Sequence, residues 1–450
     1  MRNLLVALVV VCLCACQNAG ASGTRIRVMA GLDKPLVLAG SEDTVLVKVG
    51  LQGDELLLNN KRLPMNIAIV LDHSGSMNSQ NKLENAKQGA IEIVDRLTSE
   101  DIVSLVIYDD RAQVLLPAQR ASDKRRITDI IRSVQTGGST ALYAGVSLGA
   151  EELRKNIGQG HLSRIVLLSD GLANVGPQST EELAGLGSEL SRDDIAVSTV
   201  GVGLDYNEDL MTALAAQGSG NSYFAENSDE LPDIFAEEIG EAMTVLASKI
   251  NMRLECAEDV VPQAVLGRTA SIQGRQASVK INNLYGKNEK YALFELKVPK
   301  GAAGSQRELA KIEVEYFNPL TKEQVKEVKT VSISYSLDRT AVEQNMDKKV
   351  LKEAALTKAS QAKQDAIRLA DQGQYQQASQ VMAAQATMLE KVAAQCNNDK
   401  AMLHESAKLK VTYSNMESRK GLSRYERKRL ANEAYMQEGQ QFYAPAKESK

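Results

Sequence analysis

The sequence predicts an α/β fold with a doubly wound, mostly parallel sheet, inserted in a β-sandwich and followed by a C-terminal helical hairpin. Between residue 65 and about residue 248, short apolar runs alternate with amphipathic helical patterns, as in a parallel sheet covered by helices on both faces. On either side of this region, apolar residues recur at every second position, which is typical of strands buried on one face. After residue 341 they recur with helical spacing instead.

The composition narrows the class of protein. A chain of 450 residues is long enough for two or three domains with cores of their own. Its net charge of −4 argues against a nucleic-acid-binding protein, which normally carries a strong basic excess. Because the chain has no Trp and only five Phe, we expect no large aromatic binding platform.

The N-terminus predicts export. Residues 1–15 combine a positive charge at Arg2 with an apolar run that is too short to span a bilayer. The residues Leu-Cys-Ala-Cys that end at Cys16 resemble the bacterial lipobox, and this resemblance implies a lipid on Cys16; an ordinary signal peptide with incidental cysteines is the alternative. By the same resemblance, Gln17 implies the outer membrane of a Gram-negative bacterium, with residues 16–24 as a tether.

Two separate parts of the chain share the alternating strand pattern. Residues 25–63 and residues 250–338 both show it, and we expect them to form one sandwich. The α/β domain, residues 64–249, would then be inserted between them. The apolar positions that share a face in these segments include Val45, Val47, Val49, Leu51, Phe294, Leu296 and Val298.

The α/β region predicts four buried strands and one edge strand. The edge strand, residues 112–116, follows the second buried strand after one short turn, so the two should pair antiparallel. The last helix is expected from residue 229 to residue 248. The buried strands are expected at residues 65–71, 102–108, 164–169 and 195–201.

Residues 341–400 predict the helical hairpin. Alanines recur on one helical face until residues 371–378 break the helix and restart it. The motif Gly373-x-Tyr375-x-x-Ala378 resembles the start of the second helix of a tetratricopeptide unit. No further unit follows at the required spacing, so a single hairpin packed on the sandwich is the other interpretation.

Two features of the remaining chain leave alternatives open. Residues 401–450 predict a charged helical or disordered tail, whose basic run at 419–429 is either solvated or a patch for a membrane or a partner. Cys256 and Cys396 could form a disulfide in an oxidising compartment. Two unpaired thiols are the alternative.

Three polar motifs lie where strands end or a helix begins. Asp72, Ser74 and Ser76 follow the first buried strand, Thr140 lies in a Gly-Gly loop before a helix, and Asp170 follows the third buried strand. In open α/β sheets the carboxyl ends of the strands form the ligand-binding edge. Carboxylate and hydroxyl oxygens suit Mg²⁺, or Mn²⁺ or Ca²⁺, and suit Zn²⁺ poorly.

This combination resembles a von Willebrand factor type A domain with a complete metal-ion-dependent adhesion site. The resemblance covers the α/β region and implies that Ser74 and Ser76 coordinate the metal directly. It also implies that Thr140 does so in the open form, and that Asp72 and Asp170 hold metal-bound waters. A metal with few direct carboxylates stays electrophilic, and in this family it typically accepts an Asp or Glu side chain of a partner protein. The same fold with a silent site is the alternative.

We expect no catalytic residues. No Lys follows Gly137-Gly138-Ser139-Thr140, which excludes a P-loop. The three His residues form no His-Glu-x-x-His motif, and no Gly-x-Ser-x-Gly elbow follows a strand.

The whole chain resembles bacterial exported proteins that are called calcium-activated chloride channel homologues, a label that gives no evidence of ion conduction. We expect a metal-dependent, protein-binding adhesion or scaffold module, lipid-anchored in the bacterial cell envelope. An accessory or sensor subunit of an envelope complex is the alternative, and an enzyme with an unrecognised site is a third.

Overall fold

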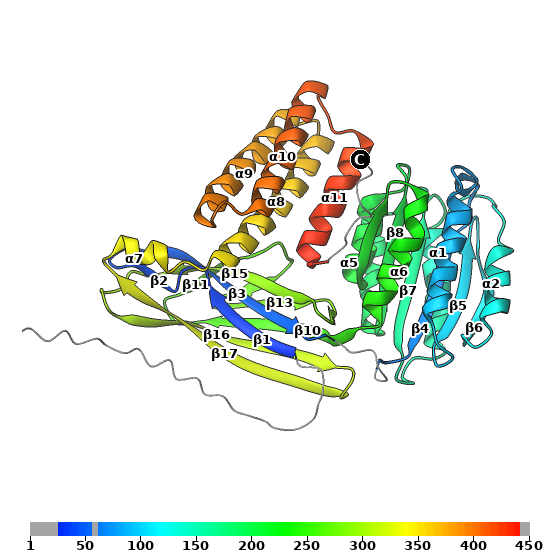
Figure 1. Cartoon of the computed structure of the whole chain (residues 1–450), viewed down its shortest axis with the longest axis horizontal. Coiled ribbons are helices and arrows are strands. Elements are labelled where there is room, and N and C mark those ends of the chain that lie inside the picture. The colour runs from blue at the N-terminus through cyan, green and yellow to red at the C-terminus, as the bar shows by residue number, and fades with distance from the viewer. Residues whose placement is uncertain (1–25, 56–61, 442–450) are drawn as a thin grey trace, which may run out of the picture.

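The computed structural model describes residues 26–55 and 62–441. The expected signal peptide, Cys16 with its lipid, and the tether lie outside this part of the chain. The described chain has three parts: an α/β domain, a β-sandwich and a group of long C-terminal helices that lies above the sandwich and beside the α/β domain (Figure 1).

The α/β domain is built on a sheet with the strand order β6-β5-β4-β7-β8-β9. β5 and β6 are antiparallel and the other neighbours are parallel, as the sequence predicts. β9 was not predicted, because the polar residues at its start interrupt the apolar pattern. The strands are β4 (Met65–Asp72), β5 (Ile102–Tyr108), β6 (Ala112–Arg120), β7 (Leu162–Ser169), β8 (Ile195–Val202) and β9 (Ser219–Ala225).

Helices cover both faces of this sheet, so that every residue of the central strand β4 is buried. One face packs against α1 (Lys82–Arg96), α2 (Lys124–Arg132) and α6 (Leu231–Ala242). The other packs against α3 (Leu142–Arg154), α4 (Thr180–Arg192) and α5 (Glu208–Gln217).

The last helix of the domain ends earlier than predicted. α6 ends at Ala242, and the strand β10 (Val245–Cys256) begins three residues later. Val245 and Ala247 pair with the short strand β14 (Leu284–Tyr285). A short apolar run fits a helix or a strand equally well. Here the run forms a strand because β14 is available to pair with it.

The sandwich is assembled from both sides of the inserted domain. One sheet has the order β1-β3-β15-β11 and the other β12-β13-β10-β16-β17-β2. The N-terminal strand β3 pairs with β15 along its length, from Asp43 opposite Val298 to Gln52 opposite Glu289. The strands are β1 (Ile26–Leu32), β2 (Leu36–Leu38), β3 (Asp43–Gly53), β11 (Val261–Leu266), β12 (Ser271–Gln273), β13 (Gln276–Ile281), β15 (Glu289–Val298), β16 (Gln306–Asn318) and β17 (Glu323–Ser336).

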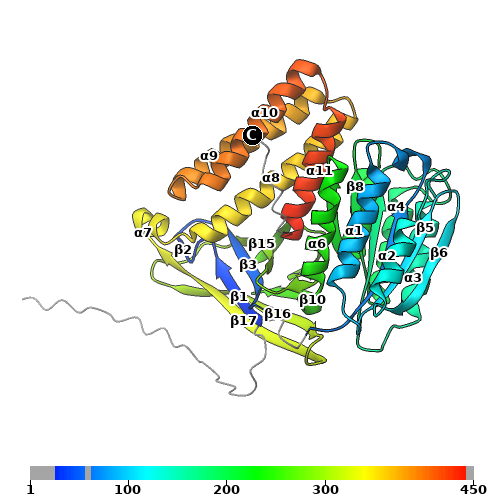
Figure 2. The same cartoon turned by 45° about the vertical axis from the view of Figure 1, so that its right-hand side comes forward.

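The C-terminal helices form a bundle that is larger than a hairpin. After the short helix α7 (Arg339–Gln344), α8 (Lys348–Asp371) and α9 (Tyr375–Gln395) form the expected hairpin. α10 (Lys400–Arg419) packs on α9, and α11 (Arg424–Gly439) packs on α8 and faces the α/β domain (Figures 1 and 2). Within the described residues no helix is both long and apolar enough to cross a membrane.

The described part of the tail is helical, which was one of the two expected alternatives, and Arg419, Lys420 and Arg424 of its basic run are exposed. For the end of the run, in α11, a fully solvated face is the wrong expectation. Lys428 is buried and its Nζ donates to Glu208 Oε2 at 2.5 Å. Arg427 pairs with Asp209 and Asp371, each at 2.7 Å. Cations of this kind can be buried when they are paired. The partner Glu208 lies 220 residues earlier than Lys428, so no local pattern could reveal it.

The two described cysteines are free. Cys256 is buried in the sandwich, where burial raises the pKa of its thiol to about 11. Cys396 ends α9, and its Sγ lies 3.6 Å from the carbonyl oxygen of Lys348. The disulfide that the sequence left open is therefore absent from this structure.

Candidate metal site

The first part of the site is a buried carboxylate at the end of the central strand. Asp72 is the last residue of β4 and is fully buried. Its Oδ1 accepts a hydrogen bond from the Ser74 N–H at 2.9 Å, and its Oδ2 accepts one from the Ser169 hydroxyl at 2.9 Å. Burial raises the pKa of Asp72 to about 6, although the hydrogen bonds from Ser74 oppose the increase. A cation beside this carboxylate would remove the cost of keeping it charged.

Two serine hydroxyls lie directly beside this carboxylate. Ser74 is buried and Ser76 is exposed, and their Oγ atoms are 3.1 Å apart. Ser76 Oγ donates to Oδ1 of Asp170 at 2.6 Å, and Asp170 is fully buried at the end of β7. The site therefore has a buried acidic floor and opens to solvent on the side of Ser76.

The glycine-rich loop brings the third hydroxyl to the same place. Thr140 is buried just before α3. A Cβ placed on Gly171 would lie 3.4 Å from Thr140 Oγ1 and 3.6 Å from Ser76 Oγ, so both hydroxyls lie against the loop that follows Asp170. The Gly75 N–H donates to the carbonyl oxygen of Gly138 at 2.9 Å and ties the first two loops together.

Asp109 and Asp110 hold the glycine-rich loop, and the sequence analysis missed both. The Gly138 N–H donates to Asp109 Oδ2 at 3.1 Å, and the Ser139 N–H donates to Asp110 Oδ1 at 2.9 Å. Partial burial opposes ionisation of Asp109, but the N–H groups of Gly138 and Arg111 outweigh it and lower its pKa. A signal was present, because the two residues follow β5 at the same edge of the sheet as Asp72.

Two more residues were missed. Asn174 accepts the Thr140 N–H on its Oδ1 at 2.8 Å and so fixes the loop from the other side. Lys82, the first residue of α1, places its Nζ 2.7 Å from Asp170 Oδ2. No motif marks either position. The Nδ1 of His73 lies 2.9 Å from the carbonyl oxygen of Gln135, and its Nε2 lies 3.7 Å from Asp109 Oδ2.

The donor set fits a hard divalent cation. The five residues predicted from the sequence converge, and they offer three hydroxyls and two carboxylates. Such oxygen donors suit Mg²⁺ or Mn²⁺. Within the described residues, this edge included, no group of three or more His, Cys, Asp or Glu side chains is placed to hold a metal ion, so the site depends on its hydroxyls as well as its carboxylates.

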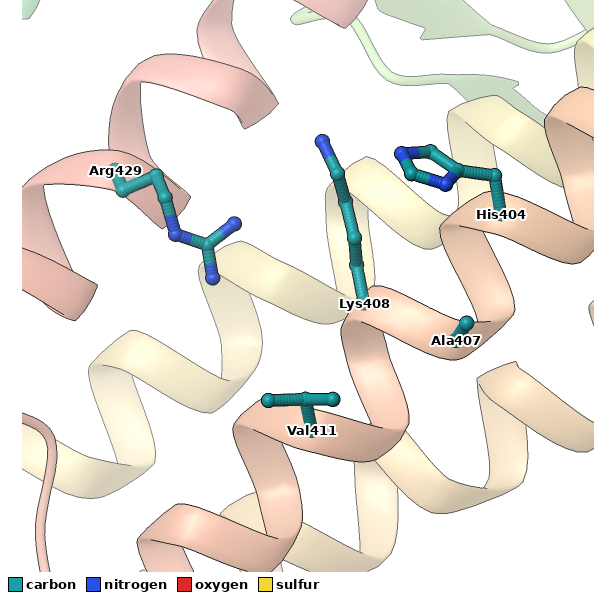
Figure 3. Close-up of a pocket in the computed structure, with 5 residues that line it drawn as sticks. All are labelled: His404, Ala407, Lys408, Val411 and Arg429. Atoms are coloured by element: carbon teal, nitrogen blue, oxygen red, sulfur yellow. The ribbon is translucent and has the colours of Figure 1, made fainter. Parts of the chain in front are cut away.

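A hollow of about 320 Å³ lies in the helical bundle, away from this sheet edge, and basic side chains from α10 and α11 line it (Figure 3). Lys408 and Arg429 both contact Glu433 Oε1, at 3.4 Å and 2.7 Å, so their charges are partly compensated. His404 and Lys408 lie beside each other on α10 (Figure 3). We find no nucleophile and base held together there.

Comparisons with known proteins place the α/β domain in a known family. Residues 66–237 match the family model of the von Willebrand factor type A domain. An uncharacterized protein of Synechocystis sp. is 28% identical over 289 residues, which are 62% of this chain and 67% of that protein. The uncharacterized protein YfbK of Escherichia coli is 27% identical over 217 residues, 48% of this chain and only 37% of its own length.

The fold also matches a solved structure along almost the whole chain. A von Willebrand factor type A protein from Catenulispora acidiphila superimposes with a TM-score of 0.68 at 14% identity. The match covers 93% of this chain and 98% of that one. At this level of identity the likeness concerns the fold alone.

Proposed function

Since residues 66–237 of this chain form a von Willebrand factor type A domain, we propose that the protein is a metal-dependent protein-binding module. Ser74, Ser76 and Thr140 would hold a divalent cation, with Asp72 and Asp170 behind it. The cation would supply a Lewis-acidic position for one acidic side chain of a partner. The observation that carries this proposal is the convergence of three hydroxyls on two fully buried carboxylates.

The surroundings of the site favour a protein as the partner. Leu172 is 58% exposed and Leu204 is 39% exposed. Leu172 follows Gly171, and Leu204 follows Gly203, which lies against Lys82 at the floor of the site. Exposed apolar side chains beside a polar centre are typical of protein interaction sites.

We place this module in the bacterial cell envelope on the basis of the sequence pattern at Cys16 alone. The variant Cys16→Ser should move the protein from the membrane fraction to the soluble fraction when cells are fractionated. A variant that stays in the membrane fraction as the unsubstituted protein does would argue against a lipid at this position.

Removing single hydroxyls tests the proposed metal site. Ser74→Ala and Thr140→Val should each weaken Mn²⁺ binding by at least about tenfold, because each removes one oxygen ligand and little volume. Free Mn²⁺ can be measured by electron paramagnetic resonance during a titration of the full chain. Ser139→Ala is the matched control, since it removes a neighbouring hydroxyl of the same loop and keeps the backbone N–H that donates to Asp110.

Metal-dependent binding of a partner protein is tested by a separate measurement. Crosslinking in the native envelope should capture a partner in Mg²⁺ and lose it in EDTA, and Ser74→Ala should lose it in both conditions. Capture that is the same in all of these conditions would contradict metal-dependent binding.

A further inference from the structure

Lys82 is unusual in its position on the helix and in its burial. It is the first residue of α1, where the positive end of the helix dipole disfavours a cation. It is also buried, with 5% of its surface exposed, and lysine is almost never buried without a partner. Such local conflicts in a natural protein are expected at functional positions.

The backbone before Lys82 shows the same conflict. Gln80 and Asn81 both have left-handed conformations, with φ of 51° and 54°. Two such non-glycine residues in succession are energetically unfavourable. Asn81 makes no side-chain cap for the helix, and only its backbone carbonyl accepts a hydrogen bond from α1, from the Asn85 N–H at 2.9 Å. The effect of the turn is to direct Lys82 toward the sheet edge.

The ammonium group of Lys82 is held at the floor of the site. Its Nζ donates to Asp170 Oδ2 at 2.7 Å, while Ser76 Oγ occupies the other carboxylate oxygen. A Cβ placed on Gly203 would lie 3.6 Å from Nζ, so the loop after β8 closes over it. Among the described ion pairs, this is the one in which both side chains are buried at the metal edge.

We infer that Lys82 is a built-in cation that lowers the affinity of the site for metal and leaves the bound metal with an uncompensated positive charge. The inference rests on the proposed metal-binding function. With Asp72 and Asp170 alone, a divalent ion would be neutralised by its own site. With Lys82 present, one unit of positive charge remains, and a single Asp or Glu side chain of a partner can neutralise it.

This charge arrangement also explains how the metal-free site is kept folded. Asp170 is fully buried, and an unpaired buried carboxylate would be strongly destabilising. Lys82 supplies its counter-charge in the absence of metal. Lys82 therefore favours both the metal-free state and the capture of an acidic ligand, and it opposes the binding of metal alone.

The test is a comparison of Mn²⁺ affinities in the full chain, with free Mn²⁺ measured by electron paramagnetic resonance. Lys82→Met and Lys82→Gln should each bind Mn²⁺ at least about tenfold more tightly, because each removes a cation that repels the metal at short range. Lys82→Arg keeps the charge and should bind as weakly as the unsubstituted chain. In EDTA, Lys82→Met should also melt at a lower temperature than the unsubstituted protein.

Lys87→Met is the matched control. Lys87 is equally buried on the same helix, but its Nζ binds Glu84 and the carbonyl oxygen of Arg132, away from the site. It should leave the Mn²⁺ affinity unchanged.

The outcomes separate the inference from the proposed function. The inference is overturned if the unsubstituted chain binds Mn²⁺ and both Lys82→Met and Lys82→Gln bind it with the same or lower affinity. If only Lys82→Met and Lys82→Gln bind Mn²⁺, the inference is supported, because Lys82 alone then prevents binding by the unsubstituted chain. No binding by any of the proteins at millimolar Mn²⁺ overturns the proposed function, and the inference with it.

Discussion

An Asp72→Asn substitution is expected to make the metal-free protein more stable and, at the same time, to abolish its stabilisation by Mn²⁺. Burial raises the pKa of Asp72 from 3.8 to about 6, so the folded protein holds this carboxylate charged at pH 7.5 only at a cost. Since one pKa unit corresponds to about 1.4 kcal/mol, that cost is at most about 3 kcal/mol. Asparagine has nearly the same shape, and its amide oxygen can still accept the hydrogen bond from the Ser74 N–H.

The effect of Asp72→Asn on the stability of the metal-free protein should depend on pH. Between about pH 4 and pH 6 the folded protein binds more protons at Asp72 than the unfolded chain does, so metal-free stability falls as the pH rises. Above pH 6 the folded protein bears the full free-energy cost of keeping the Asp72 carboxylate charged. The gain from Asp72→Asn should therefore be close to zero at pH 4 and largest at pH 7 or above.

Urea denaturation in EDTA at pH 4.5 and pH 7.5 measures this difference. With Mn²⁺ at about a hundredfold excess over its dissociation constant, the unsubstituted protein should gain about 2.7 kcal/mol, whereas Asp72→Asn should gain nothing. The order of stability of the two proteins would then reverse or become equal. Asp129→Asn, at an exposed position on α2, is the control. If Asp72→Asn is stabilised by Mn²⁺ as much as the unsubstituted chain, Asp72 does not belong to the metal site.

The largest loss of stability is expected from Glu238→Ala. Glu238 of α6 is fully buried and forms an ion pair with Arg164 of β7, which is 2% exposed. Removing one partner of such a pair leaves a buried charge without compensation and typically costs about 3–5 kcal/mol. Asn221 Nδ2, which donates to Glu238 Oε2 at 2.9 Å, also loses its acceptor.

This ion pair lies at the junction of two domains, which gives the substitution a second effect. Arg164 Nη2 donates to the hydroxyl of Tyr285 at 2.8 Å, and Tyr285 belongs to β14 of the sandwich. Glu238→Ala should therefore loosen the contact between the α/β domain and the sandwich. Hydrogen exchange at β14 and the start of β10 should increase, while exchange in α9 stays unchanged.

Two further variants test whether the loss of stability in Glu238→Ala comes from the broken buried ion pair. The double variant Arg164→Met/Glu238→Leu should recover much of the loss, because replacing a buried ion pair with apolar side chains is often neutral. Glu100→Gln breaks an ion pair with Arg120 in which both side chains are more than half exposed, and it should cost less than about 1 kcal/mol. A loss for Glu238→Ala as small as this control would show that the buried pair contributes little.

The five site residues could be proposed as a group because four of them follow buried strands and the fifth lies in a Gly-Gly loop before a helix. Asp72 and Asp170 end buried parallel strands, and such ends meet at one edge of the sheet. The Gly-Gly pair before Thr140 marked the loop that must approach them closely. In the structure, hydrogen bonds join Asp72 to Ser74 and Ser76 to Asp170, the Ser74 and Ser76 hydroxyls lie 3.1 Å apart, and Thr140 lies against the loop that follows Asp170.

The residues that support the site could not be predicted with the same certainty. Asp109 and Asp110 follow the strand rule, but nothing in the sequence shows that they bind the N–H groups of the glycine-rich loop. A lysine is unusual at the first position of a helix, but its burial against Asp170 cannot be read from the sequence. These roles depend on contacts between loops, and those contacts have no period or spacing of their own.

The order of the domains, the parallel sheet, the inserted arrangement and the oxygen-rich edge could be predicted from the amino-acid sequence, because the hydrophobic period and the succession of helices and strands are local properties of the chain. Which charges are buried depends on the folded chain. Lys82, Arg164 and Lys428 are buried because carboxylates far away in the sequence come within hydrogen-bond distance of them. A buried charge is stable only with its partner, and that partner is a property of the folded chain.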